Sequence, residues 1–183
     1  NLGAFGDAGA VTTNNEYLAN RIRMLANHGR EQKYSHEFEG TNSRMDGIQG
    51  GILSVKLKYL NDWNNKRQQN AKLYLELLND IAEIELPKII HGYEHVFHLF
   101  VIRTNKRKDL QSYLAENNIQ TGIHYPIALP FLKAYDYLKY KSGDFPIAEK
   151  YQDEILSLPM FPELSEEKIY YVSKLIHQFF EIE

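Results

Sequence analysis

The sequence contains no cysteine, so disulfide bonds and thiolate-ligated metal sites are excluded. This absence fits a reducing compartment, and we expect a cytoplasmic protein. No apolar run is long enough to cross a bilayer, and the first residues lack the basic-then-apolar order of a signal peptide. The formal net charge of -3 offers no cationic field, so neither nucleic acid nor an anionic membrane is an expected partner.

The residues that are present are typical of a globular protein. Hydrophobic residues make up 43% of the chain, charged residues 25% and aromatic residues 13%. A chain of 183 residues with this composition can bury a substantial core. No internal repeat or low-complexity tract interrupts it.

The first third of the chain predicts one strand and one helix before a polar loop. A short apolar and β-branched run predicts a strand over residues 8–13. Asn15 is a candidate N-cap for a helix whose apolar residues share one face until Gly29. Residues 30–44 show no periodicity and predict a loop, and loops of this length are often functional or covered by another chain.

A strong helical periodicity starts at Asp46 and continues to Leu78. Neither proline nor glycine occurs in it after Gly51, so it predicts one long helix, straight or kinked, that connects two packed bodies. The remainder alternates between strand and helix patterns, which predicts an α/β unit. The expected strands span residues 84–86, 96–102, 119–123 and 156–159, and the expected helices span 109–117, 132–138, 146–155 and 166–180.

Two groups of residues resemble functional motifs only superficially. Gly3, Gly6 and Gly9 have neither the spacing of a Walker loop nor a preceding strand, and tight turning is the favoured interpretation. His95 and His98 lie at an odd offset in an expected strand, so their side chains should point to opposite faces. We therefore predict structural roles for these histidines and no metal site.

Two other segments carry groups suited to ligand binding. Around the start of the long helix, Asn42, Ser43 and Arg44 offer neutral donors and a fixed cation, which suit an anion such as phosphate. The same residues can instead cap the helix or form a surface ion pair. His124 and Tyr125, at the end of an expected strand, can bind a sugar or phosphate, or fill a domain interface.

Taken in order, these segments resemble the carboxy-terminal half of the DegT/StrS family of pyridoxal-phosphate (PLP) sugar-nucleotide aminotransferases. No single motif decides the resemblance, whereas the ordered set is specific. The segments are Asn1-Leu2-Gly3-Ala4, Gly6-Asp7-Ala8-Gly9-Ala10-Val11, Ile22-Arg23-Met24-Leu25-Ala26-Asn27-His28-Gly29, Asn42-Ser43-Arg44-Met45-Asp46, His124-Tyr125-Pro126 and Leu158-Pro159-Met160-Phe161-Pro162-Glu163-Leu164.

The resemblance implies the aspartate-aminotransferase fold (fold type I of PLP enzymes). Residues 1–55 would be the carboxy-terminal remnant of the large PLP-binding domain, and residues 56–183 the small domain. The cofactor lysine is expected immediately before Asn1, so no catalytic residue is expected in this chain. Asn42 and Arg44 would bind the cofactor from a neighbouring subunit of a homodimer with shared active sites. His124 and Tyr125 would bind the substrate.

The implied reaction moves an amino group from an amino acid, usually glutamate, to a keto group on a nucleotide-linked sugar. Relatives of the same fold that carry histidine in place of the lysine dehydrate sugars instead, and the two classes share everything visible in this sequence. A fragment that only dimerises, through residues 30–44 and the long helix, is an alternative of another class. A generic α/β binding module is a further alternative.

Overall fold

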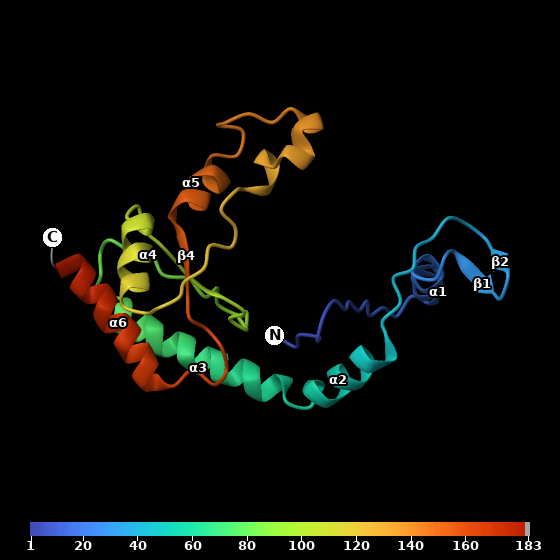
Figure 1. Ribbon diagram of the computed structural model, residues 1–183, viewed down its shortest axis with the longest axis horizontal. Coiled ribbons are helices and arrows are strands. Elements are labelled where there is room, and N and C mark those ends of the chain that lie inside the picture. The colour runs from blue at the N-terminus through green and yellow to red at the C-terminus, as the bar shows by residue number, and fades with distance from the viewer. Residues whose placement is uncertain (182–183) are drawn as a thin grey trace. The chain divides into compact units, whose positions relative to one another are not determined.

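The computed structural model describes residues 1–181, and the chain separates next to Leu60 into two units (Figure 1). The amino-terminal unit spans Leu2–Leu60. The carboxy-terminal unit spans Asn61–Glu183 and also includes Asn1. Some of the helices and strands of each unit match those that the sequence pattern predicts.

The amino-terminal unit contains helices α1 (Glu16–Leu25) and α2 (Gly47–Leu57) and the short strands β1 (Arg30–Gln32) and β2 (Ser35–His36). The predicted N-cap of α1 is confirmed, because the Asn15 side-chain oxygen accepts a hydrogen bond of 3.1 Å from the Leu18 amide. Strands β1 and β2 pair in antiparallel fashion within the predicted loop. Such short strands carry no periodicity by which a sequence pattern could reveal them.

The predicted strand over residues 8–13 is wrong. These residues are exposed, and no described strand pairs with them. A β-branched run favours an extended backbone, but a strand forms only where a neighbour satisfies its backbone groups.

The predicted single long helix is also interrupted. Helix α2 ends at Leu57 and helix α3 (Leu60–Leu78) begins three residues later. At the break, the Tyr59 amide donates to the Lys56 carbonyl at 3.0 Å, a tightened turn that replaces the regular helical ladder. Neither Lys58 nor Tyr59 breaks helices by its residue type, which is why the apolar periodicity continues through the interruption.

The carboxy-terminal unit has helices on a small antiparallel sheet. Strand β3 (Phe100–Arg103) pairs with β4 (Ile155–Leu158), so that Phe100 lies opposite Leu158. The predicted strands 84–86 and 119–123 are reduced to single bridges, Glu85 with Arg103 and Gly122 with Ser157. The helices are α3, α4 (Arg107–Glu116), α5 (Pro146–Glu154) and α6 (Glu166–Glu181), with short 3-10 turns at Leu129–Phe131 and Lys133–Leu138.

The hydrophobic core lies in this second unit. Side chains from α3, both strands, α4 and α6 contribute to it, and those that are fully buried include Tyr74, Leu78, Phe100, Ile102, Leu110, Leu114, Leu156, Ile169 and Ile176. Figure 1 shows α6 running alongside α3, and the His177 ring donates to the Leu77 carbonyl at 2.8 Å. This unit carries His98, His124 and Tyr125, whereas Asn42 and Arg44 lie in the amino-terminal unit.

Candidate functional site

Asn42 and Arg44 lie on a segment that is anchored to the end of α1. The Thr41 amide donates to the Leu25 carbonyl at 2.8 Å, and the Ser43 amide donates to the Ala26 carbonyl at 2.9 Å. In the opposite direction, the His28 amide donates to the Thr41 carbonyl at 2.9 Å. These backbone bonds hold the segment in a defined position even though its side chains are exposed.

Two glycines allow the chain to approach itself closely at this anchor. Gly29 has a φ of +68°, and a Cβ atom there would lie 1.6 Å from the Phe38 carbonyl oxygen. A Cβ atom on Gly40 would lie 2.1 Å from the Gly29 backbone nitrogen. Only glycine fits both positions, so these residues determine where the Asn42 segment sits.

The structure brings Asn42 and Arg44 into direct contact. Nε of Arg44 donates to Oδ1 of Asn42 at 3.0 Å, and a second guanidinium nitrogen lies 3.5 Å from Oδ1 of Asn27. Asn27 also accepts from Arg30 at 3.2 Å. Asn27 belongs to a predicted motif, yet sequence reasoning assigned it no role, because only the fold brings it next to Arg44.

The outward groups of this pair are hydrogen-bond donors. Oδ1 of Asn42 is occupied by Arg44, and within residues 1–181 no acceptor contacts its Nδ2 amide. The exposed guanidinium adds a fixed positive charge. Neutral amide donors beside a cation match the oxygens of a phosphate group, so these two residues fit the cofactor phosphate that the family resemblance implies.

His124 is held in the other unit by a buried serine. Ser157 on β4 is 4% exposed, and its hydroxyl oxygen lies 2.9 Å from Nδ1 of His124. Because side chains alternate along a strand, Ser157 faces away from its core neighbours Leu156 and Leu158. The backbone bridge between Gly122 and Ser157 brings the two side chains together.

Tyr125 borders an apolar hollow next to His124. Its side chain is 73% exposed, and its ring lies edge-on to the His124 ring with centroids 5.7 Å apart. The hollow has a volume of about 340 Å³. It is lined by Tyr125, Ile127, Ala128, Leu129, Pro130, Ala148, Tyr151, Gln152 and Ile155.

His98, for which the sequence favoured a structural role, lies beside Asn1. Its Nδ1 is 3.2 Å from Oδ1 of Asn1. Partial burial lowers the pKa of His98, and the nearby Arg67 and His124 lower it further. The sequence argument placed His98 in a strand, but β3 begins only at Phe100, so the alternation rule does not apply to it.

Arg67 of α3 binds the segment that precedes β3. One of its terminal nitrogens lies 3.1 Å from each of three carbonyl oxygens, those of Phe97, His98 and Met160. These bonds tie the residues that precede β3 to the segment that follows β4. Burial lowers the pKa of Arg67, while the nearby charge of Glu163 raises it.

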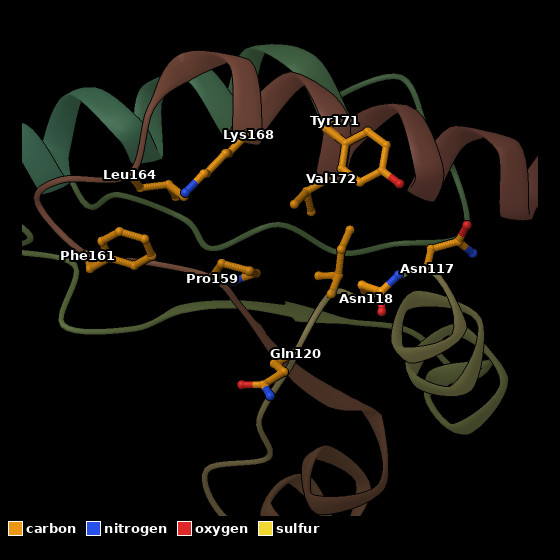
Figure 2. A pocket seen from close by; sticks show the side chains of 10 residues that line it. Asn117, Asn118, Gln120, Pro159, Phe161, Leu164, Lys168, Tyr171 and Val172 are labelled. Atoms are coloured by element: carbon orange, nitrogen blue, oxygen red, sulfur yellow. The ribbon is translucent and has the colours of Figure 1, made fainter.

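A second hollow, of about 650 Å³, lies apart from these residues (Figure 2). Figure 2 shows Lys168, Tyr171 and Val172 of α6 on one side of it and the turn with Asn117 and Asn118 on another. None of Asn42, Arg44, His124 or Tyr125 lines it. Its larger volume therefore does not make it the candidate functional site.

Residues 1–181 contain neither a cluster of metal-ligating side chains nor a membrane-spanning helix. No three histidine, aspartate or glutamate side chains gather closely enough there to hold a metal ion. Within the same residues, no helix combines the length and apolar character needed to cross a membrane.

Comparison with known proteins identifies the family. The model of the DegT/DnrJ/EryC1/StrS aminotransferase family matches residues 1–177. The chain belongs to this family. The resemblance predicted from the ordered motifs is thereby confirmed.

Two curated relatives illustrate the match. A protein of Geobacillus stearothermophilus named pleiotropic regulatory protein is 43% identical over 98% of this chain, which corresponds to 49% of that protein. The dTDP-3-amino-3,6-dideoxy-alpha-D-galactopyranose transaminase of Aneurinibacillus thermoaerophilus is 45% identical over 93% of this chain and 46% of that protein. The chain therefore spans about half the length of the curated relatives it matches.

Among solved structures, S. venezuelae DesV in complex with a ketimine intermediate superposes with a TM-score of 0.94. It is 40% identical, and the match covers 98% of this chain and 48% of that one. The predicted fold class is confirmed: the chain has the α/β fold of the carboxy-terminal part of fold type I PLP enzymes.

Proposed function

We propose that the whole protein is a PLP-dependent aminotransferase that moves an amino group from an amino acid, glutamate in the first instance, to a nucleotide-linked keto sugar. The observation that carries this proposal is the family match over residues 1–177. The name of the Aneurinibacillus relative, a transaminase of a dTDP-amino sugar, supports the substrate class. This chain would contribute the carboxy-terminal half.

Asn42 and Arg44 would hold the cofactor phosphate. Their contact leaves the Asn42 amide and the guanidinium as the outward groups, which is the donor set that a phosphate requires. PLP supplies an electron sink at the amino-bearing carbon when it is bound. The role of these two side chains would be to orient it and to balance its charge.

We further propose that the protein is a homodimer in which Asn42 and Arg44 serve the neighbouring subunit's site. Exposed apolar side chains on α1 and α2 support this assembly, because neither helix has a buried residue in the described chain. Ile48 is 78% exposed, Val55 59% and Leu25 50%. Such faces are stable in water only when another surface covers them.

On the substrate side, His124 and Tyr125 would bind the sugar nucleotide. The Ser157 contact fixes the His124 ring, and the hollow beside Tyr125 offers an apolar wall for a ring system. We retain the division into a large-domain remnant, residues 1–55, and a small domain, residues 56–183, as part of the proposal. A cytoplasmic location also belongs to it.

The residue that precedes Asn1 in the gene tests the reaction class. The proposal expects lysine there, so that this chain itself supplies no catalytic residue. Histidine would indicate the sugar dehydratases of the same fold, and any other residue would contradict both readings. Reading the upstream codon decides among these outcomes.

Activity of the full-length protein is the second test. The purified protein should show the visible absorbance of PLP, lose it when glutamate is added, and regain it when a dTDP- or UDP-linked keto sugar follows. Absorbance that does not respond to glutamate would contradict the aminotransferase proposal.

A second candidate is a role in assembly without catalysis. The regulatory name of the Geobacillus relative and the exposed apolar faces favour it. This second candidate function predicts that the 183-residue chain forms a stable oligomer that shows no PLP absorbance. A split enzyme would instead regain PLP binding when the chain is mixed with its missing half.

A further inference from the structure

The amide group of Asn1 has a fixed orientation. Its Nδ2 donates to the Asn64 side-chain oxygen at 2.7 Å and to the Val96 carbonyl at 2.8 Å. A backbone carbonyl can only accept, so the atom that faces Val96 must be the nitrogen. The Asn1 side-chain oxygen is therefore the atom that faces His98.

This orientation determines the tautomer of His98. The Asn1 oxygen has no proton, so Nδ1 of His98, 3.2 Å away, must be the donor. A neutral imidazole that is protonated on Nδ1 presents a bare lone pair at Nε2. Within the described part of the chain, no group contacts that Nε2 atom.

The electrostatic surroundings keep the ring neutral. Partial burial lowers the pKa of His98 below its usual 6.5, and Arg67 and His124 lower it further. Near neutral pH, Nε2 is consequently an acceptor. Phosphate oxygens are also acceptors, so they cannot bind there, whereas a hydroxyl group can donate to it.

The position of His98 indicates which hydroxyl it meets. Its ring contacts Asn1, the residue expected next to the cofactor lysine, and it is close enough to His124 for the two rings to interact electrostatically. These three residues come from distant parts of the sequence but belong to the same unit. A sugar bound for amination would place its ring hydroxyls beside them.

We propose that His98 is a substrate-binding residue whose Nε2 accepts a hydrogen bond from a ring hydroxyl of the sugar. This inference rests on the proposed function, because it assumes a sugar substrate beside the lysine. In this proposal His98 binds the sugar ring, and it binds neither the diphosphate nor the amino-acid donor.

Two substitutions separate this role from a structural one. In His98→Asn, the amide nitrogen can replace Nδ1 as donor to Asn1, but nothing replaces the Nε2 acceptor. In His98→Gln, the side-chain oxygen can reach the position of Nε2, while the contact with Asn1 is lost. If His98 binds the substrate, His98→Asn should lower kcat/KM for the sugar and His98→Gln should lower it less. If His98 only holds Asn1, His98→Gln should be the more impaired variant.

The assay uses the full-length protein and a panel of dTDP- and UDP-linked 3-amino sugars as amino donors. If the wild type accepts none of them and does not react with glutamate either, the proposed function fails first. With an accepted sugar, we expect His98→Asn to lower kcat/KM roughly five- to tenfold, the size of one neutral hydrogen bond. Substrate binding predicts that His98→Asn lowers kcat/KM more for the sugar than for glutamate, so the ratio of the two values is the readout.

A spectroscopic measurement checks the chemistry independently of turnover. In ¹⁵N-labelled protein, the His98 nitrogens should show the Nδ1–H tautomer, and the Nε2 resonance should shift when the accepted sugar binds. An Nε2–H tautomer, an Nε2 signal indifferent to bound sugar, or an unimpaired His98→Asn variant would overturn the inference.

Discussion

The Oδ1 atom of Asn42 accepts from Arg44, whereas its Nδ2 group is an outward donor. A substitution that changes only the donor can therefore test the role of Nδ2 separately. Asn42→Asp keeps the oxygen that accepts from Arg44 but replaces the outward donor by a negatively charged acceptor. Against a phosphate this loses a charged hydrogen bond, worth about 1.5–3 kcal/mol. We expect PLP affinity of the full-length protein to fall roughly ten- to a hundredfold, measured by absorbance titration.

Asn20→Asp is the matched control for that substitution. Asn20 is also exposed and also accepts from an arginine, Arg23, at 3.0 Å. Asn20→Asp adds the same negative charge, but residue 20 does not belong to the proposed phosphate site. Equal losses in the two variants would show that net charge, not the Asn42 amide, governs cofactor binding.

Gly122 leaves the space that the His124 ring occupies. A Cβ atom there would lie 2.6 Å from Cε1 of His124. The ring is the end of a flexible side chain, so Gly122→Ala should move it from Ser157 at a cost in unfolding free energy of about 1 kcal/mol or less. We expect altered His124 resonances in NMR spectra and a raised KM for the sugar.

Gly9→Ala provides the comparison, because no atom of residues 1–181 lies within 4 Å of its added Cβ. It should leave both the His124 resonances and the KM for the sugar unchanged. A Gly122→Ala protein with unaltered His124 resonances would contradict the packing described.

The lowered pKa of His98 makes a pH-dependent contribution to stability. Protonation is less favourable in the folded chain than in the unfolded one, so this contribution is fully present above the unfolded pKa of 6.5. It is lost as the pH falls from there through the lower folded pKa. Urea unfolding between pH 7 and pH 5 should show a smaller decline in His98→Asn than in the wild type; equal declines would contradict this assignment.

At the scale of elements, helix α3 positions the His98 loop through Arg67. The two N–H groups of one terminal nitrogen are shared among three carbonyls from two loops. Arg67→Met keeps the apolar stem and removes these bonds. We expect the unfolding free energy to fall by about 2–4 kcal/mol, because three carbonyls, two of them in partly buried bonds, lose a charged donor.

The single tryptophan, Trp63, lies on α3 and reports its unfolding by fluorescence. Lys72→Ala is the control on the same helix, since Lys72 forms an exposed pair with Glu76 at 3.7 Å. Such pairs contribute about 0.5 kcal/mol or less. Similar effects of both substitutions would show that Arg67 does not hold the loops together.

At the scale of the whole molecule, the two units differ in how much they bury. The core residues of the described chain belong to the carboxy-terminal unit, whereas the helices of the amino-terminal unit have no buried residue. The first unit therefore depends on a covering surface that the second does not need. In the proposed homodimer, a second subunit would provide this cover.

A charge on the exposed face of α2 should weaken association. Ile48→Glu replaces a side chain that is 78% exposed, and we expect a higher monomer fraction in sedimentation experiments on the full-length protein. Tyr93→Glu, at a residue that is 75% exposed in the other unit, should leave association unchanged. An Ile48→Glu protein that associates like the wild type would argue against this interface.

The sequence by itself determined the family and most of the helices. Ordered motifs identify a family because many short matches in a fixed order are improbable together. Helix α1 can be predicted from its own residues: Asn15 is a typical N-cap, and the apolar residues that follow recur at helical spacing. The residues proposed for binding, Asn42, Arg44, His124 and Tyr125, came from the same motifs.

Only the tertiary structure decided which residues meet. The strand expected at residues 8–13 lacks a partner within residues 1–181, and β3 begins only at Phe100. The contacts of Asn27 with Arg44, of Ser157 with His124 and of His98 with Asn1 join residues far apart in the sequence. Strand pairing and side-chain hydrogen bonds depend on such distant neighbours, so no local pattern in the sequence could reveal them.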